Sequence, residues 1–234
     1  MRRRIGDKLS LALVITNLSE LRLLIGQVAE AEQALAFGRQ ACGPGIPGTR
    51  LAHFAVAAAR IHLAKGNTLE ASAEIRRAID GASSSRDGNK LCECYRLAAR
   101  VALDDGDVLR AETALGLARE KASTDLARAD IAVLEAMAAR AKGAPYAVAA
   151  RQALDLARRA EDAELAREAH LLLHFDAVAT GDGRAARLHL DAALTQRNRI
   201  AFSLPDEMRR RFLARRELAE LALLESSFGN APAE

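Results

Sequence analysis

The sequence predicts an all-α protein: an α-solenoid of about five stacked helix pairs, with a C-terminal capping helix. Glycine recurs at Gly26, Gly66, Gly106 and Gly181, with spacings of 40, 40 and 75 residues. Each of these glycines is followed five residues later by an alanine: Ala31, Ala71, Ala111 and Ala186. A period near 40 residues is typical of helical repeat proteins, in which each helix pair contacts only its neighbours.

The composition favours packing by small and aliphatic side chains. Half of the 234 residues are apolar, but only 3% are aromatic and tryptophan is absent. Alanine and leucine both favour helices, and alanine lets two helices approach closely. A chain of this length can bury one sizeable core or a row of smaller ones.

The apolar residues recur at helical spacing, and the breaks in that pattern separate the predicted helix pairs. Two prolines and three glycines in loop 42–49 cannot continue the second helix of the first pair. A serine-rich polar loop, 83–89, ends the second pair, and Thr124 offers an N-cap for the first helix of the fourth. Gly143 marks the turn of the fourth pair, and Pro145 suits the first turn of the helix that follows. The five predicted pairs cover residues 6–41, 50–82, 90–122, 125–160 and 163–198.

The last predicted element is an amphipathic helix over 204–226, which begins at Leu204-Pro205-Asp206-Glu207. It is suited to cover the end of the stack, because a solenoid needs a polar cap at each end. We expect the helices to form a single domain over residues 1–226, followed by a flexible tail at 227–234. Because the N-terminus leads directly into a repeat, we also expect the chain to belong to a longer protein.

The predicted units resemble the tetratricopeptide repeat (TPR) superfamily. That family has small residues in the first helix, a glycine at the turn, and two alanines that flank a large residue in the second helix. The second unit has Ala58, Ala59, Gly66, Ala71, Ile75 and Ala78 at these positions. The third unit repeats the pattern with Gly106, Ala111, Leu115 and Ala118, and the fifth with Gly181, Ala186, Leu190 and Ala193. The resemblance covers roughly residues 8–198, and the units are longer than the family's repeat of about 34 residues.

Long, alanine-rich units of this kind are similar to the repeat arms of large bacterial regulators. The resemblance implies a non-catalytic domain that recognises a protein or an effector in signalling or transcription regulation. The alternative is a free-standing TPR scaffold or co-chaperone that binds peptide tails. The implied partner is a protein, a peptide, or a neighbouring domain of the same longer chain.

The resemblance also implies that the first helix of each pair lines a concave, partner-binding face. The candidate binding residues on that face are His53, Arg60, Glu93, Arg96, Arg100 and Phe175. Arg60, Arg96 and Arg100 would form a basic strip able to hold a carboxylate or an acidic peptide. In the alternative interpretation, these arginines form salt bridges with Glu93 and Asp104 and are structural.

The charge balance argues against direct nucleic-acid binding. The chain has 34 basic and 31 acidic residues, a net charge of +3, whereas nucleic-acid-binding domains concentrate basic residues on one face. No apolar run reaches the ~18 residues of a membrane span, and the N-terminus lacks the apolar core of a secretory signal. Cys92 and Cys94 diverge on one predicted helix, which favours reduced thiols in a cytoplasmic protein.

Motifs for catalysis or metal binding are incomplete. His170 and His174 have the i, i+4 spacing of two metal ligands on a helix, but only leucines lie between them. A third ligand would have to come from His189 or Asp176. We therefore interpret His170 and His174 as helix-packing residues, and we expect no enzymatic activity, no cofactor and no metal.

Overall fold

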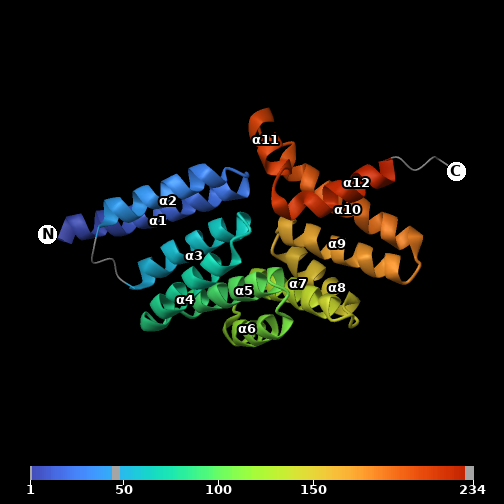
Figure 1. The fold of residues 1–234 in the computed structure, drawn as a ribbon, viewed down its shortest axis with the longest axis horizontal. Helices are drawn as coiled ribbons and strands as arrows, with labels where there is room; N and C mark the ends of the chain where they lie inside the picture. The colour runs from blue at the N-terminus through green and yellow to red at the C-terminus, as the bar shows by residue number, and fades with distance from the viewer. Residues whose placement is uncertain (1, 44–47, 230–234) are drawn as a thin grey trace. The chain divides into compact units, whose positions relative to one another are not determined.

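The computed structural model describes residues 2–43 and 48–229 of the chain (Figure 1). These residues form helices joined by short turns, so the predicted all-α stack of helix pairs is confirmed. The chain divides into two compact units, residues 1–123 and 124–234. The predicted loop 42–49 lies partly outside the described residues. None of the helices in the described ranges has the length and hydrophobicity that a membrane span requires.

Unit 1 contains three helix pairs. They are α1 (Arg2–Leu24) with α2 (Val28–Cys42), α3 (Gly48–Ala64) with α4 (Thr68–Ser84), and α5 (Gly88–Asp104) with α6 (Val108–Lys121). The second helix of the first and of the second pair also packs against the first helix of the next pair. In addition, α3 contacts both α1 and α5. The three first helices therefore form one continuous layer, as Figure 1 shows.

Unit 2 contains two helix pairs and a C-terminal segment. The pairs are α7 (Asp125–Ala141) with α8 (Ala147–Arg159) and α9 (Ala163–Ala179) with α10 (Gly183–Ala201). The segment consists of α11 (Asp206–Leu213), a short 3-10 helix η1 (Arg216–Leu218) and α12 (Ala219–Gly229). Leu221 and Leu224 of α12 pack against α9 and α10, so α12 covers the end of this stack.

The expectation of one continuous helix over 204–226 is wrong. The chain leaves the helix after Leu213, and Arg215 is extended, with φ −60° and ψ 142°. Arg215 is held there by Glu164 of α9, whose Oε2 lies 2.7 Å from its Nη2, and by the Phe212 ring, 4.7 Å from its guanidinium carbon. These contacts favour the break, which redirects α12 onto α9 and α10.

The recurring glycines end the first helices. At Gly66, φ is 78°, and the N–H groups of Gly66 and Asn67 donate to the carbonyls of Leu63 and His62 at 2.9 and 2.8 Å. This is the Schellman arrangement, and its left-handed residue is usually glycine because a Cβ would be crowded there. The same arrangement, with φ between 69° and 77°, occurs at Gly26, Gly106, Gly143 and Gly181.

The recurring alanines lie where helices meet. The alanines that follow the turn glycines are 0–4% exposed: Ala31, Ala71, Ala111 and Ala186. The second alanine of the repeat pattern, seven residues after the first, is fully buried at Ala78, Ala118, Ala157 and Ala193. The first pair has Gly38 instead, where a Cβ would lie only 2.6 Å from Ile15 Cγ2 and 3.0 Å from Phe54 Cε1. The predicted register of small residues is therefore confirmed.

Candidate partner-binding face

Five of the six predicted binding residues lie on two neighbouring helices of unit 1. His53 and Arg60 are on α3, and Glu93, Arg96 and Arg100 are on α5. All five are half-buried, as are Glu20 of α1 and Lys90 of α5. We call these seven residues the first-helix face of unit 1.

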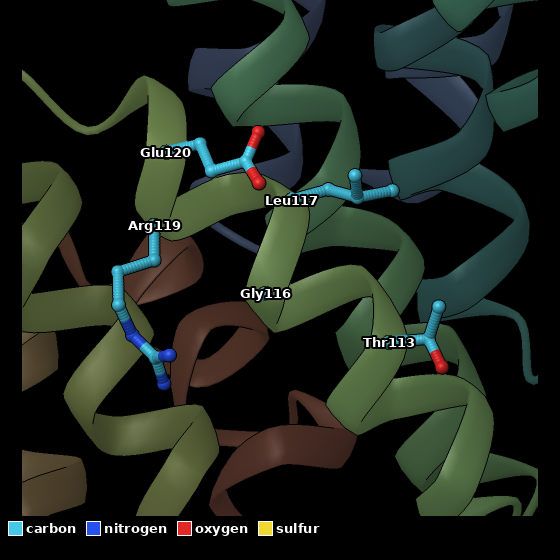
Figure 2. A pocket seen from close by; sticks show the side chains of 5 residues that line it. All are labelled: Thr113, Gly116, Leu117, Arg119 and Glu120. Atoms are coloured by element: carbon cyan, nitrogen blue, oxygen red, sulfur yellow. The ribbon is translucent and has the colours of Figure 1, made fainter.

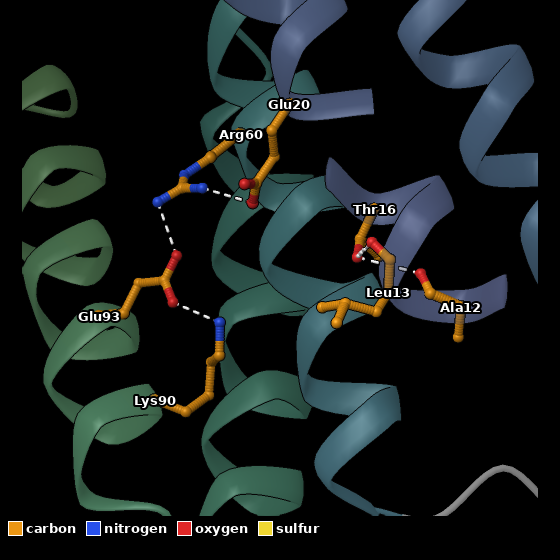
Figure 3. Close-up of polar contacts among 7 residues, drawn as sticks. All are labelled: Ala12, Leu13, Thr16, Glu20, Arg60, Lys90 and Glu93. Carbon is orange, nitrogen blue, oxygen red and sulfur yellow. Dashed lines mark hydrogen bonds and ion pairs between the residues drawn. The ribbon is translucent and has the colours of Figure 1, made fainter. Parts of the chain in front are cut away.

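Ion pairs link the three first helices (Figure 3). The Arg60 guanidinium lies between two carboxylates: Nη1 is 2.5 Å from Glu20 Oε1, and Nη2 is 2.7 Å from Glu93 Oε1. Lys90 pairs with the other carboxylate oxygen of Glu93. Positive and negative groups thus alternate across α1, α3 and α5.

This geometry supports the structural interpretation of Arg60. The sequence suggested Glu93 as a partner, and the structure shows that pair. The sequence did not suggest Glu20, the second partner of Arg60. Glu20 lies one 40-residue period before Arg60, so the repeat itself could have pointed to it.

The pKa shifts follow from burial and from these neighbouring charges. Burial alone would raise the pKa of Glu93, but Arg60 and Lys90 outweigh it and hold that pKa below its usual value. Burial, assisted by Lys90, lowers the pKa of His53, so its ring is neutral at pH 7. Burial and Glu93 raise the pKa of Cys94 to about 12, so this thiol is a poor nucleophile. At pH 7, Glu93 is therefore charged and His53 is neutral.

Phe175, the sixth predicted residue, lies on α9 in unit 2. It packs against an apolar cluster that includes Leu171 of its own helix and Leu221 of α12, and the guanidinium carbon of Arg140 lies 3.8 Å from the ring centroid. Glu220 of α12 pairs with Arg140 at 3.6 Å. Phe175 therefore borders a cluster to which the C-terminal segment of its own unit contributes.

The two histidines of α9 are buried and make short polar contacts. His174 Nδ1 donates to the Ala186 carbonyl at 2.9 Å, and His170 Nδ1 lies 3.1 Å from His189 Nδ1. Burial, together with His189, lowers the pKa of His170 to about 4. These contacts agree with the helix-packing interpretation. Among the described residues, no three side chains gather as potential metal ligands.

A shallow hollow of about 560 Å³ lies on α6 (Figure 2). It is lined by Thr113, Gly116, Leu117, Arg119 and Glu120, all from one helix. The Thr113 hydroxyl donates to the Leu109 carbonyl of its own helix at 3.0 Å, and Arg119 extends away from Leu117 and Glu120 in Figure 2. The hollow lacks the convergent polar groups of a small-molecule site.

Comparison with protein-family models, with curated proteins and with solved structures finds no match to this chain. The chain is an all-α stack of helix pairs, and the first-helix face of unit 1 is crossed by ion pairs.

Proposed function

We propose that this chain is a non-catalytic recognition module, a TPR-type repeat arm of a bacterial signalling or transcription-regulating protein. Its first-helix face in unit 1 binds a segment of another protein or of a neighbouring domain. The observation that carries the proposal is the grouping of seven half-buried polar side chains from the first helices of three successive pairs. Repeat proteins bind partners on extended surfaces of this kind, because successive repeats contribute equivalent positions.

The charges of the face favour an acidic partner segment. Its cations are Arg60, Lys90, Arg96 and Arg100, and its carboxylates are Glu20 and Glu93. The cations therefore outnumber the carboxylates. A carboxylate of a bound segment could accept two parallel hydrogen bonds from a planar guanidinium such as that of Arg96 or Arg100.

Fluorescence anisotropy with a short fluorescein-labelled, glutamate-rich peptide tests this proposal. The protein should bind the peptide, and affinity should fall as salt rises, because exposed charges are screened beyond about 8–10 Å at physiological ionic strength. The double variant Arg96→Ala/Arg100→Ala should bind about 10-fold more weakly, a loss of about 1.4 kcal/mol. Its circular dichroism should match that of the wild type.

A matched control removes the same charge from the second helices. Arg76 of α4 and Lys121 of α6 are exposed, so the variant Arg76→Ala/Lys121→Ala should bind like the wild type. A glutamine-rich peptide of the same length should not bind. Equal losses in the two double variants would show that net charge, and not the first-helix face, governs binding.

A further inference from the structure

The outward side of α1 carries a row of uncovered apolar side chains. Leu11, Val14, Leu18 and Leu21 are 36%, 62%, 41% and 61% exposed. Their spacing of three, four and three residues is the heptad spacing, which places them in a stripe along the helix. We call these four residues the α1 stripe.

Charge is nearly absent from this part of α1. Between Leu9 and Leu24 the charged residues are Glu20 and Arg22, and both have partners within unit 1. Glu20 pairs with Arg60, and Arg22 Nη1 donates to the Glu30 carbonyl at 2.9 Å. On the other side of α1, Ala12 and Ile15 pack into unit 1. Apolar side chains therefore lie on two sides of this helix.

In α3, the first helix of the next pair, the side chains at the corresponding positions are covered. One period later, Val14, Leu18 and Leu21 correspond to Phe54, Ala58 and Ile61. These three side chains are 2–4% exposed and pack with residues of α2. The α1 stripe thus has the chemistry of a surface that another helix covers, although no helix among the described residues of unit 1 lies over it.

We propose that a second copy of this chain covers the α1 stripe, with the two α1 helices antiparallel about a two-fold axis. A two-fold contact brings the same patch of both copies together, so the patch must be self-complementary. The stripe meets this condition, since it is apolar along its length and has the spacing needed for knobs-into-holes packing. With the axis between Val14 and Leu18, Leu11 of one copy lies opposite Leu21 of the other.

The polar residues beside the stripe also suit a second copy. Ser10 and Asn17 are exposed on the same side of α1 and are uncharged, so they would not select a partner of opposite charge. With the axis placed as above, the Asn17 amides of the two copies lie on the same side of the contact. A single polar pair of this kind can fix the register of two packed helices.

The apolar area is large enough for a specific contact. Leu24 follows Leu21 by three residues, so it continues the stripe, and it is 42% exposed. The five side chains together expose on the order of 400 Å² of apolar surface, the size of patch that marks an interaction site. Two such faces supply about 800 Å² of apolar surface, and their polar rims bring the contact towards the roughly 1,000 Å² that is the lower bound for a specific interface.

Sedimentation equilibrium of the intact chain at micromolar concentrations tests the proposal. The wild type should show twice the monomer mass of 25.1 kDa. The substitution Leu21→Glu should raise the dimer dissociation constant at least about 30-fold, because it places a charge at an apolar anchor in each copy. Its circular dichroism should not change, since Leu21 is 61% exposed in one copy.

Leu69→Glu is the matched control, because Leu69 of α4 is 76% exposed and lies outside the stripe. This variant should remain a dimer. A monomeric wild type would overturn the proposal, and so would equal dissociation of the two variants. A monomer whose α1 stripe binds a different helical protein would show that the stripe serves another partner.

Discussion

Arg60 joins three helices through one guanidinium, with Glu20 contributed by α1 and Glu93 by α5. An exposed ion pair contributes only about 0.2–1 kcal/mol, because water screens the charges and both side chains lose freedom. Glu93, however, is only 18% exposed, and Arg60 and Lys90 offset the rise in its pKa that burial causes. At the residue scale, Arg60 therefore stabilises the layer of first helices. It also favours the charged form of Glu93 in the candidate face.

Replacing Arg60 by alanine should lower the free energy of unfolding by about 1–2 kcal/mol at pH 7, since Glu93 is left with less compensation for its burial. The pKa of Glu93 should rise in this variant. Urea unfolding checks the stability and NMR titration checks the pKa. Arg76→Ala on the exposed side of α4 is the control and should change stability by less than about 0.5 kcal/mol. Equal, small effects of both substitutions would mean that the ion pairs do not persist in solution.

His170 should make the protein less stable in mild acid. Its pKa is about 4 in the folded state, below the ordinary value of 6.5, so the unfolded chain binds the proton more readily. The free energy of unfolding therefore has its full value above pH 6.5. It decreases by about 1–3 kcal/mol as the pH falls towards 4. Protonation is opposed by burial and by His189 of α10 and Arg158 of α8.

Unfolding by urea between pH 7 and pH 4.5 measures this effect, with His170→Asn for comparison. The asparagine places a polar atom near the position of Nδ1 but does not titrate, so the variant should lose less stability over this range. The same pH dependence in both proteins would assign the acid sensitivity to other groups, such as His53 and His189, whose pKa values are also lowered.

At the scale of elements, small residues decide how closely helices cross. Gly38 of α2 is buried against Ile15 and Phe54, whereas a Cβ on Gly116 of α6 would meet no atom within 4 Å. Both glycines lie inside helices, where glycine costs about 1 kcal/mol relative to alanine. Only at Gly38 is that cost offset by a close approach of helices.

The two glycines should therefore respond to alanine in opposite directions. Gly116→Ala should raise the free energy of unfolding by about 0.5–1 kcal/mol through helix propensity alone. Gly38→Ala should lower it by about 1 kcal/mol, because overpacking outweighs the gain in propensity. Chemical denaturation of both variants measures the difference. Stabilisation by Gly38→Ala would contradict the crossing described at Ile15 and Phe54.

The turns and the crossings were predictable from the sequence because their causes are local or periodic. A left-handed residue at the turn favours glycine, although Arg86 and Glu161 also adopt a positive φ at their turns. A close crossing requires alanine or glycine at a fixed register. The break near Arg215 was not predictable in this way, since it depends on Glu164, 51 residues away. The position of α12 depends on the same break. The Glu20–Arg60 pair could have been predicted, because the two residues share one register.

At the scale of the whole molecule, contacts between neighbouring helices dominate. Unit 1 and unit 2 each consist of helix pairs that pack on the pairs next to them in sequence. In a stack of this kind, stability is close to a sum of the stabilities of the repeats and of the contacts between neighbours. A local defect should therefore weaken its own neighbourhood before it weakens the rest of the chain.

Hydrogen exchange measured by mass spectrometry on Ala71→Leu and Ala186→Leu tests this architecture most directly. Each substitution overpacks a buried alanine at the same register of a different unit and should cost about 1–3 kcal/mol. We predict that Ala71→Leu accelerates exchange in α3, α4 and α5, and that Ala186→Leu does so in α9 and α10. Uniform acceleration along the whole chain in both variants, or no acceleration in either, would contradict a stack of helix pairs held by contacts between neighbours.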